Sequence, residues 1–281
     1  MEWSRKPGNQ ELEIRERDGV CFLAFPALDR TGVVKHAFST RLGGVSRGVY
    51  ATMNFGFTRG DDPAHVIENY HRMAHLLGIE MNRMVLSHQT HTVNVRRVTE
   101  ADAGKGIVKP RDYANVDGLI TDVPGLTLVT FFADCVPLYF VDPVHRVIGL
   151  SHSGWRGTVK RMGQVTLERM REEYGTDPAD VVACIGPSIC GDCYEVGGEV
   201  VEEFTQAFAT CHHDRIFHAK CNEKYQLDLW AANRIVLGEA GVKPENIHVT
   251  DICTHCNPQL LFSHRTTGEA RGNLAAFLTL R

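Results

Sequence analysis

Three short polar segments at the ends of apolar runs hold the residues best suited to chemistry. They span 87–92, 131–137 and 150–157, and together they supply histidines, a cysteine and an arginine. The ends of β-strands bring distant residues together on a rigid backbone, as a metal site requires. A thiolate with two imidazoles is a favourable ligand set for zinc, and three protein ligands leave a fourth position for water or substrate. The pattern therefore predicts a catalytic metal centre.

Strand-like and helix-like patterns alternate around these segments. Asp62-Pro63 predicts a helix start, since proline suits the first helical turn, and apolar residues repeat at helical spacing to about Leu77. Further helices are predicted after Gly157 to about Tyr174, over 198–208 and over 227–240. Strands are predicted over 20–25, 34–39, 84–87, 93–98, 126–132, 137–141, 147–151, 181–185, 247–252 and 275–280. This mixture is not strict βαβ alternation, so we expect an α+β fold with mixed β-sheets.

Composition excludes several classes of protein. Hydrophobic residues make up 43% and charged residues 23% of the 281 residues, as in ordinary globular domains. The net charge of -4 lacks the bulk positive charge of a general nucleic-acid binder. The longest apolar run, 125–140, is too polar to span a bilayer, and the first 17 residues have no apolar stretch like a secretory signal. We therefore expect one domain over 1–281, a cytoplasmic location, and no nucleic-acid or membrane partner.

Cysteines outside the three segments raise the question of a second site. Nine cysteines are an odd number, which without a secretory signal makes a poor disulfide framework. Two Cys-x-x-Cys motifs, Cys190–Cys193 and Cys253–Cys256, contain together the four cysteines that a second zinc site would need. Neither motif has the thioredoxin-like context of a redox site. The sequence argument therefore favours a single metal centre.

A set of longer motifs resembles the YfiH/YlmD family, which carries a laccase-like label and includes the mammalian FAMIN protein. Two of them, at 17-residue spacing, are highly specific: Ala133-Asp134-Cys135-Val136-Pro137 and the run from His152 to Thr158. The other matching pieces are Phe38-Ser39-Thr40-Arg41, Gly43-Gly44-Val45-Ser46, Met53-Asn54-Phe55-Gly56, Gln89-Thr90-His91, Asp117-Gly118, Ile185-Gly186-Pro187-Ser188-Ile189, Cys193-Tyr194-Glu195-Val196, Phe262-Ser263-His264-Arg265 and Arg271-Gly272-Asn273. The resemblance is strongest over 34–273 and implies a single-domain layered sandwich with flanking helices.

The resemblance also implies the ligands and the reaction. It implies Zn²⁺ bound by His91, Cys135 and His152, with Cu²⁺ as the alternative, and His88 as a near neighbour that contacts substrate. The family's implied activity is purine nucleoside phosphorylase. Adenosine, inosine or S-methyl-5'-thioadenosine would react with phosphate to give free base and pentose 1-phosphate, and adenosine deamination would be a further activity. The expected partners are therefore purine nucleosides and phosphate, and the expected assembly is a monomer or homodimer.

Phosphorolysis requires an anion site, and the sequence offers candidates for it. Arg41 lies in a glycine-rich loop and Arg156 lies beside a predicted helix start, where a guanidinium fork would match phosphate. Asp134, between an apolar strand and the proposed thiolate, is a candidate to orient a ligand, act as a base or cap a turn. Arg41, Asp134 and Arg156 are therefore the predicted catalytic residues.

Three alternatives remain at this point. A copper-dependent polyphenol oxidase of the laccase type would use a multicopper cluster rich in His-x-His pairs, and the sequence contains no such pair. A non-phosphorolytic factor that edits cell-wall precursors would keep the fold without the activity. A cysteine hydrolase would use Cys135 as nucleophile and His152 as base.

Overall fold

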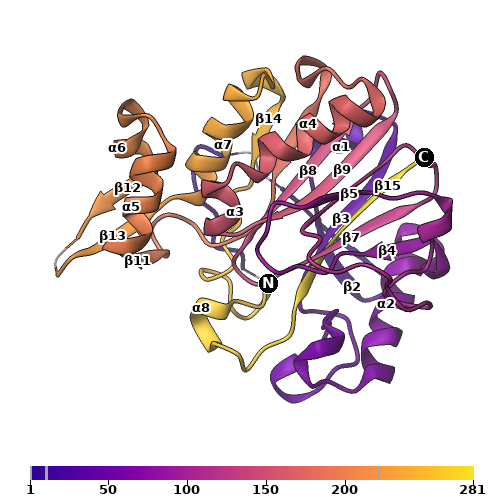
Figure 1. Ribbon diagram of the computed structural model, residues 1–281. Helices are drawn as coiled ribbons and strands as arrows, with labels where there is room; N and C mark the ends of the chain where they lie inside the picture. The colour runs from indigo at the N-terminus through magenta and orange to yellow at the C-terminus, as the bar shows by residue number, and fades with distance from the viewer. Residues whose placement is uncertain (1, 10–11, 221) are drawn as a thin grey trace.

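Two six-stranded mixed β-sheets form the centre of the computed structural model, which describes residues 2–9, 12–220 and 222–281 (Figure 1). The first sheet has the order β1-β2-β3-β15-β7-β4, and the second has the order β14-β10-β8-β9-β6-β5. The strands of the first sheet are β1 (Glu13–Arg17), β2 (Val20–Ala24), β3 (Val34–Ser39), β15 (Leu274–Leu280), β7 (Thr127–Phe132) and β4 (Met84–Leu86). Those of the second are β14 (Ile247–Val249), β10 (Val182–Ile185), β8 (Val136–Asp142), β9 (Val147–Ser153), β6 (Gly118–Thr121) and β5 (Val95–Arg97).

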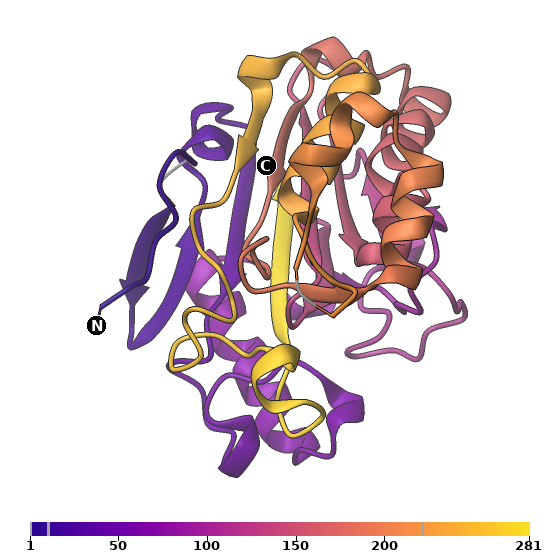
Figure 2. The same cartoon turned by 90° about the vertical axis from the view of Figure 1, so that its left-hand side faces the viewer.

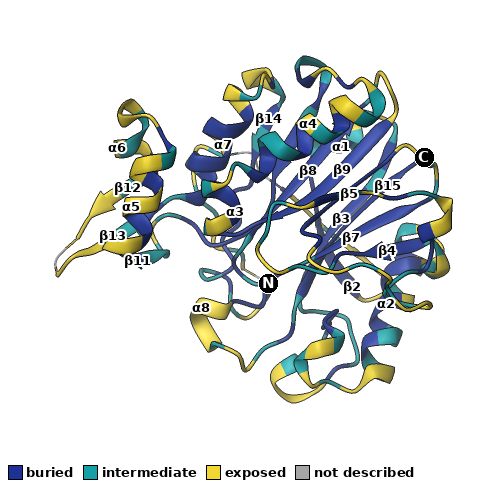
Figure 3. Cartoon of the chain, in the orientation of Figure 1, coloured by how far each residue is buried: buried dark blue, intermediate teal, exposed yellow. Residues whose placement is uncertain are grey.

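The two sheets pack face to face, and their central strands are buried on both sides. In β15, Leu274, Ala276 and Leu278 point into the core between the sheets, while Ala275 and Phe277 point to the opposite face of the first sheet. This alternation follows from the two-residue period of a strand. The sequence of β15 is continuously apolar because the side chains on each of its two faces are buried in a separate hydrophobic core. Figure 3 shows these strands as the buried centre of the molecule.

Helices cover the outer faces of both sheets and so complete four layers. Helix α2 packs on the outer face of the first sheet, and α4 and α7 pack on the outer face of the second. The helices are α1 (Pro26–Arg30), α2 (Pro63–Leu77), α3 (Trp155–Val159), α4 (Met162–Tyr174), α5 (Gly198–Ala207), α6 (His213–Ile216), α7 (Leu229–Glu239) and α8 (His264–Thr267). Helix α2 begins and ends where its sequence predicts. The Asp62 carboxylate caps the amide of Ala64, Pro63 fills the first turn, and Gly78 ends the helix at φ +58°.

A smaller three-stranded sheet, β11-β13-β12, lies to one side with α5 and α6 (Figure 1). Its strands are β11 (Glu195–Gly197), β12 (Phe217–Ala219) and β13 (Lys224–Leu227). Apolar residues of α5, including Phe204, belong to the same buried cluster as α4 and α7. Figure 2 shows the indigo N-terminal strands on one flank, the orange helices on the other, and the yellow strand β15 between them.

The α+β class predicted from the sequence is confirmed, with corrections to particular elements. The helix predicted after Gly157 is two helices, α3 and α4, divided at Arg161, whose backbone is left-handed at φ +60°. Strands β1 and β6 and the small sheet were not predicted. Strand β1 is charged and mostly exposed, and it is an edge strand of the first sheet. Among the described residues, we find no helix with the length and apolar character needed to cross a membrane.

Candidate metal centre and active site

Three side chains from three separate segments meet at one edge of the sandwich. His91 lies in the loop after β4, Cys135 lies in the turn between β7 and β8, and His152 lies near the end of β9. One candidate ligand atom from each falls within 4.8 Å of the other two. A side chain at Gly154 would fill this space, since a Cβ there would lie 3.0 Å from the Cys135 sulfur and 3.1 Å from Nδ1 of His91. The sequence-predicted triad is therefore assembled, and its one sulfur and two nitrogens suit Zn²⁺ or Cu²⁺.

A buried carboxylate, Asp117, positions both histidines. One of its oxygens lies 2.9 Å from Nδ1 of His152 and accepts the backbone amide of His91 at 3.0 Å. The other accepts the amides of Thr90 and Thr92 and the Thr92 hydroxyl. These bonds hold His91 in its left-handed conformation at φ +62°. Because Nδ1 of His152 is engaged, its Nε2 is the nitrogen available to a metal.

Electrostatics favour the ligand form of the cysteine. Burial alone would raise the pKa of the Cys135 thiol, but the charge and hydrogen bond of His152, with a further bond from His91, lower that pKa to about 6. Burial opposes the charged form of His152, yet Cys135 and Asp117 raise its pKa to about 9. Burial also opposes the Asp117 carboxylate, whose pKa is nevertheless lowered to about 2, chiefly by His152. The thiolate is the form of cysteine that binds metals.

Replacing Asp117 with asparagine is expected to weaken metal binding about 10- to 100-fold, the usual effect of removing a carboxylate that orients a ligating histidine. The substitution keeps the shape but loses the charge that the three amides and His152 share. Competition with a chromophoric chelator measures the affinity. Asp142→Asn is the matched control, because Asp142 makes the same kind of bonds to the amide and ring of His145 at the opposite end of β8. Equal affinity in the two variants would contradict the role assigned to Asp117.

Two adjoining hollows meet at this cluster. The first, of about 320 Å³, contains His88 and extends towards Phe55 and Phe131. The second, of about 410 Å³, extends towards Trp155 and Tyr194. Residues that line both include Arg59, His91, Ala133, Cys135 and Arg271. The combined space is of the size that holds a small organic ligand.

Two arginines at the border of the hollows have unused donors. The Nε atoms of Arg59 and Arg271 are buried, and within the described part of the chain neither has a hydrogen-bond partner. Glu269 binds the Nη2 of Arg59 at 2.6 Å, and Asn273 accepts from the Nη1 of Arg271 at 2.6 Å. Burial and then the neighbouring charge of Arg59 lower the pKa of Arg271. Two adjacent guanidinium groups beside a metal-ligand cluster make a site that would attract an anion.

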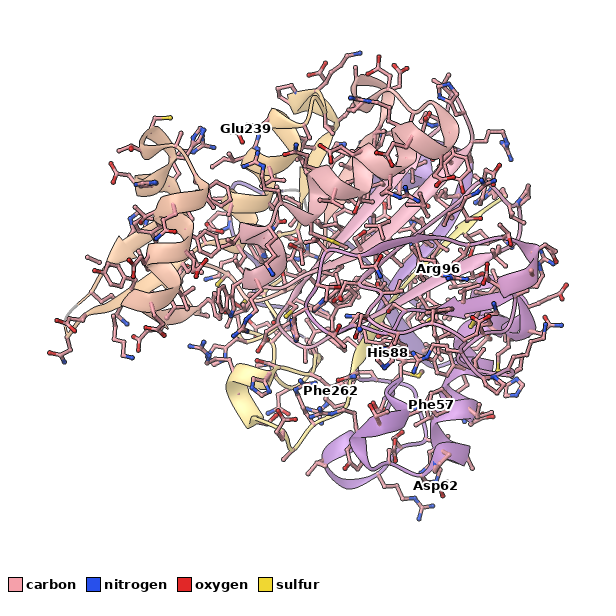
Figure 4. The ribbon with its side chains drawn as sticks, in the orientation of Figure 1. Phe57, Asp62, His88, Arg96, Glu239 and Phe262 are labelled. Carbon is pink, nitrogen blue, oxygen red and sulfur yellow. The ribbon has the colours of Figure 1, made fainter. Side chains whose placement is uncertain are left out.

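Of the other predicted residues, three line the hollows: His88, Arg156 and Asp134. His88, labelled in Figure 4, lies in the loop after β4 and lines the first hollow. Its Nδ1 accepts the amide of Asn115 at 3.1 Å, so its other ring nitrogen is the one that can meet a ligand. Arg156 is exposed in α3, lines the second hollow and stacks 4.2 Å from the Trp155 ring centre.

The side chains of Arg41 and Asp134, the other two predicted catalytic residues, are engaged in hydrogen bonds within the protein. The guanidinium of Arg41 donates to the carbonyls of Ala51 and Pro258 and lies over the Phe262 ring, away from both hollows. Its donors therefore hold a loop and are not directed at a phosphate. The Asp134 carboxylate, although at the edge of the second hollow, accepts three hydrogen bonds that tie it to the segment 254–265. They come from the hydroxyls of Thr254 and Ser263 and the amide of Arg265.

Sequence reasoning assigned no role to Arg59 or Asp117. Asp117 directly precedes an apolar strand and matches a family motif, and that signal could have marked it. Its function depends on the pairing of β6 with β9, which sets Gly118 opposite Ser151 and so places Asp117 beside His152. Arg59 has no comparable local signal, because only the folded loop before α2 brings it to the cluster.

The chain is similar to a known protein family and to several named proteins. Residues 35–281 match the family model described as multi-copper polyphenol oxidoreductase laccase. The chain is 35% identical over 248 residues to "Purine nucleoside phosphorylase YlmD" of Bacillus subtilis, covering 87% of each protein. It is 36% identical to "Adenosine deaminase RL5" of an unknown prokaryotic organism, covering 83% of this chain and 88% of that protein. The crystal structure of the Bacillus licheniformis hypothetical protein YfiH superimposes with a TM-score of 0.88 at 32% identity, covering 95% of this chain and 99% of that one.

Proposed function

This chain belongs to the family described as multi-copper polyphenol oxidoreductase laccase, and from that premise we propose that it is a zinc-dependent purine nucleoside phosphorylase. The names of relatives at 35% and 37% identity support a nucleoside-processing enzyme. The substrates would be adenosine, inosine or S-methyl-5'-thioadenosine, each with phosphate. The products would be the free base and a pentose 1-phosphate.

The observation that carries this proposal is the pair of arginines beside the three-ligand cluster. Hydrolysis or phenol oxidation has no need of an anion site, whereas phosphorolysis must hold phosphate next to the sugar. Arg59 and Arg271 line both hollows and have buried, unused Nε donors within the described residues. A guanidinium pair matches the several oxygens of phosphate. We assign the phosphate to these two residues, in place of Arg41.

The remaining residues would divide the other tasks of the reaction. A metal held by His91, Cys135 and His152 would supply Lewis-acid stabilisation of a substrate atom. Trp155 and Tyr194 line the second hollow and offer apolar rings to a purine, with Arg156 and His88 as polar contacts to the nucleoside. A phosphate oxygen attacks C1′, and the bond from C1′ to the base breaks with its electron pair on the base, where the charge must be stabilised.

Phosphate dependence tests this proposal. With inosine as substrate, we expect release of hypoxanthine only when phosphate is added, together with an equal amount of ribose 1-phosphate measured by chromatography. The rate of hypoxanthine release in a buffer without phosphate or arsenate serves as the baseline. If base appears equally fast without phosphate, the enzyme is a hydrolase and the proposal is wrong.

Adenosine deamination is a second candidate activity, favoured by the relative named adenosine deaminase. Formation of inosine and ammonia from adenosine in phosphate-free buffer would establish it separately from phosphorolysis. The oxidase alternative lacks a multicopper ligand set, because the described histidines and cysteines gather only as this triad and one group of four cysteines. The cytoplasmic location and the monomeric or dimeric state stay predictions.

A further inference from the structure

Four cysteines from two distant parts of the sequence meet in a second cluster, which shares no residue with the triad. Cys190, Cys193, Cys253 and Cys256 each place a sulfur within 4.8 Å of the other three. Cys190 and Cys253 are buried, with 3% and 0% of their surfaces exposed, and the other two are partly buried. All four are free thiols. The sequence argument for a single metal centre did not foresee this meeting.

The fold explains the meeting. Strands β10 and β14 are parallel neighbours, with Ile185 opposite Val249. One Cys-x-x-Cys motif follows the end of each strand, at nearly the same distance from it. The two loops stay paired beyond the sheet, since Thr254 donates its amide to the Ser188 carbonyl at 3.1 Å. The carboxyl ends of adjacent parallel strands lie at one sheet edge, so both motifs are delivered to the same place.

We propose that these four cysteines bind a zinc ion as a closed, structural four-thiolate site. Paired Cys-x-x-Cys motifs are a usual ligand arrangement for structural zinc, and four sulfurs leave no position for substrate. Sulfurs about 2.3 Å from a tetrahedral zinc lie about 3.8 Å from one another. Here the sulfurs of Cys193 and Cys256 are 3.4 Å apart, well beyond the length of about 2.04 Å of a disulfide bond.

A backbone amide and a lysine lie close to the four sulfurs. Zinc with four thiolates carries two net negative charges, which need nearby donors. The amide of Cys190 donates to the sulfur of Cys253 at 3.3 Å. Lys6 binds the carboxylate of Asp192, inside the first motif, at 2.8 Å, and so brings a cation next to the cluster. These contacts come from three separate parts of the chain.

The proposed zinc site would connect two segments that border the second hollow, one at each Cys-x-x-Cys motif. Ile189 and Tyr194 flank the first motif and line the second hollow. Thr254, inside the second motif, donates its hydroxyl to Asp134, the residue before Cys135. Zinc bound between the motifs would therefore fix the distance between the segment with Ile189 and Tyr194 and the turn that contains Asp134. This inference holds whether or not the enzyme is a phosphorylase.

Metal content of the full chain, purified under reducing conditions from cells supplied with zinc, tests the proposal. By elemental analysis we expect about two zinc ions per chain in the unaltered protein and about one in Cys135→Ala. The double variant Cys193→Ser, Cys256→Ser should also retain about one. Cys211→Ser is the matched control, because Cys211 is an exposed cysteine outside both clusters, and it should retain two. X-ray absorption of the Cys135→Ala protein should then give a sulfur-only shell at about 2.3 Å.

Two measurements avoid reliance on a variant that fails to fold. Titration of the unaltered protein with a mercurial reagent should release a second zinc as four thiols react, and removal of zinc from Cys135→Ala by a chelator should lower its melting temperature. A single zinc per chain that disappears entirely in Cys135→Ala would overturn the proposal. Disulfides between the four cysteines, found by mass spectrometry after alkylation without reductant, would overturn it as well.

Discussion

Replacing Cys135 with serine is expected to lower nucleoside cleavage by about three to four orders of magnitude and to remove metal from the three-ligand site. The sulfur is the one anionic ligand of the triad, and its pKa of about 6 keeps it in the ligand form near neutral pH. Metal stabilisation of a transition state contributes several kcal/mol, and about 1.36 kcal/mol is a factor of ten in rate. Steady-state kinetics and elemental analysis of the same preparation measure both losses.

The control for this prediction separates metal binding from the nucleophile alternative. Cys211→Ser removes an exposed thiol and should leave rate and metal unchanged. If Cys135 were a nucleophile with His152 as its base, treatment of the unaltered protein with a chelator would leave activity intact, and an alkylating substrate analogue would label Cys135. Full activity in the metal-depleted protein would therefore contradict the metal-centred mechanism.

Replacing Arg271 with glutamine is expected to raise the KM for phosphate about 10- to 100-fold while changing kcat much less. A hydrogen bond to a charged group contributes about 1.5–3 kcal/mol, and glutamine loses both the charge and the buried Nε donor. The KM for inosine should stay within a small factor of its original value, since Arg271 is assigned to the anion. Initial rates over a range of phosphate concentrations provide the measurement.

Arg169→Gln is the matched control, because Arg169 pairs with Glu172 and Glu173 within α4 and lines neither hollow. It should have no effect on either KM. Should Arg271→Gln instead raise the KM for inosine alone, the phosphate would have to be placed elsewhere, with Arg156 as the next candidate. A proportional fall in kcat with unchanged KM would place Arg271 in transition-state stabilisation.

How far the sequence predicted the structure depended on how local each signal was. Helix α2 has its cap, its proline and its terminal glycine within the helix or next to it, and its bounds were predicted correctly. The three proposed metal ligands were predicted as a set through family motifs, and the structure brings those three residues together. In both cases the information lies in a short stretch or in a highly specific pattern.

The missed features depend on pairings between distant strands. The role of Asp117 requires β6 beside β9, and the meeting of the four cysteines requires β10 parallel to β14. The contacts of Arg41 could not be foreseen for a related reason, since its partner carbonyl at Pro258 is more than 200 residues away in the chain. Residue type shows what a side chain can do, whereas strand order determines what it meets.

Strand β15 has a consequence for synthesis of the protein on the ribosome. It inserts between β3 and β7, pairing with residues that are translated well over a hundred codons earlier. Until residues 274–280 have emerged from the exit tunnel, β3 and β7 each present an open edge and the core between the two sheets is incomplete. The nascent chain must therefore keep long apolar segments from aggregating until residues 274–280 have been translated.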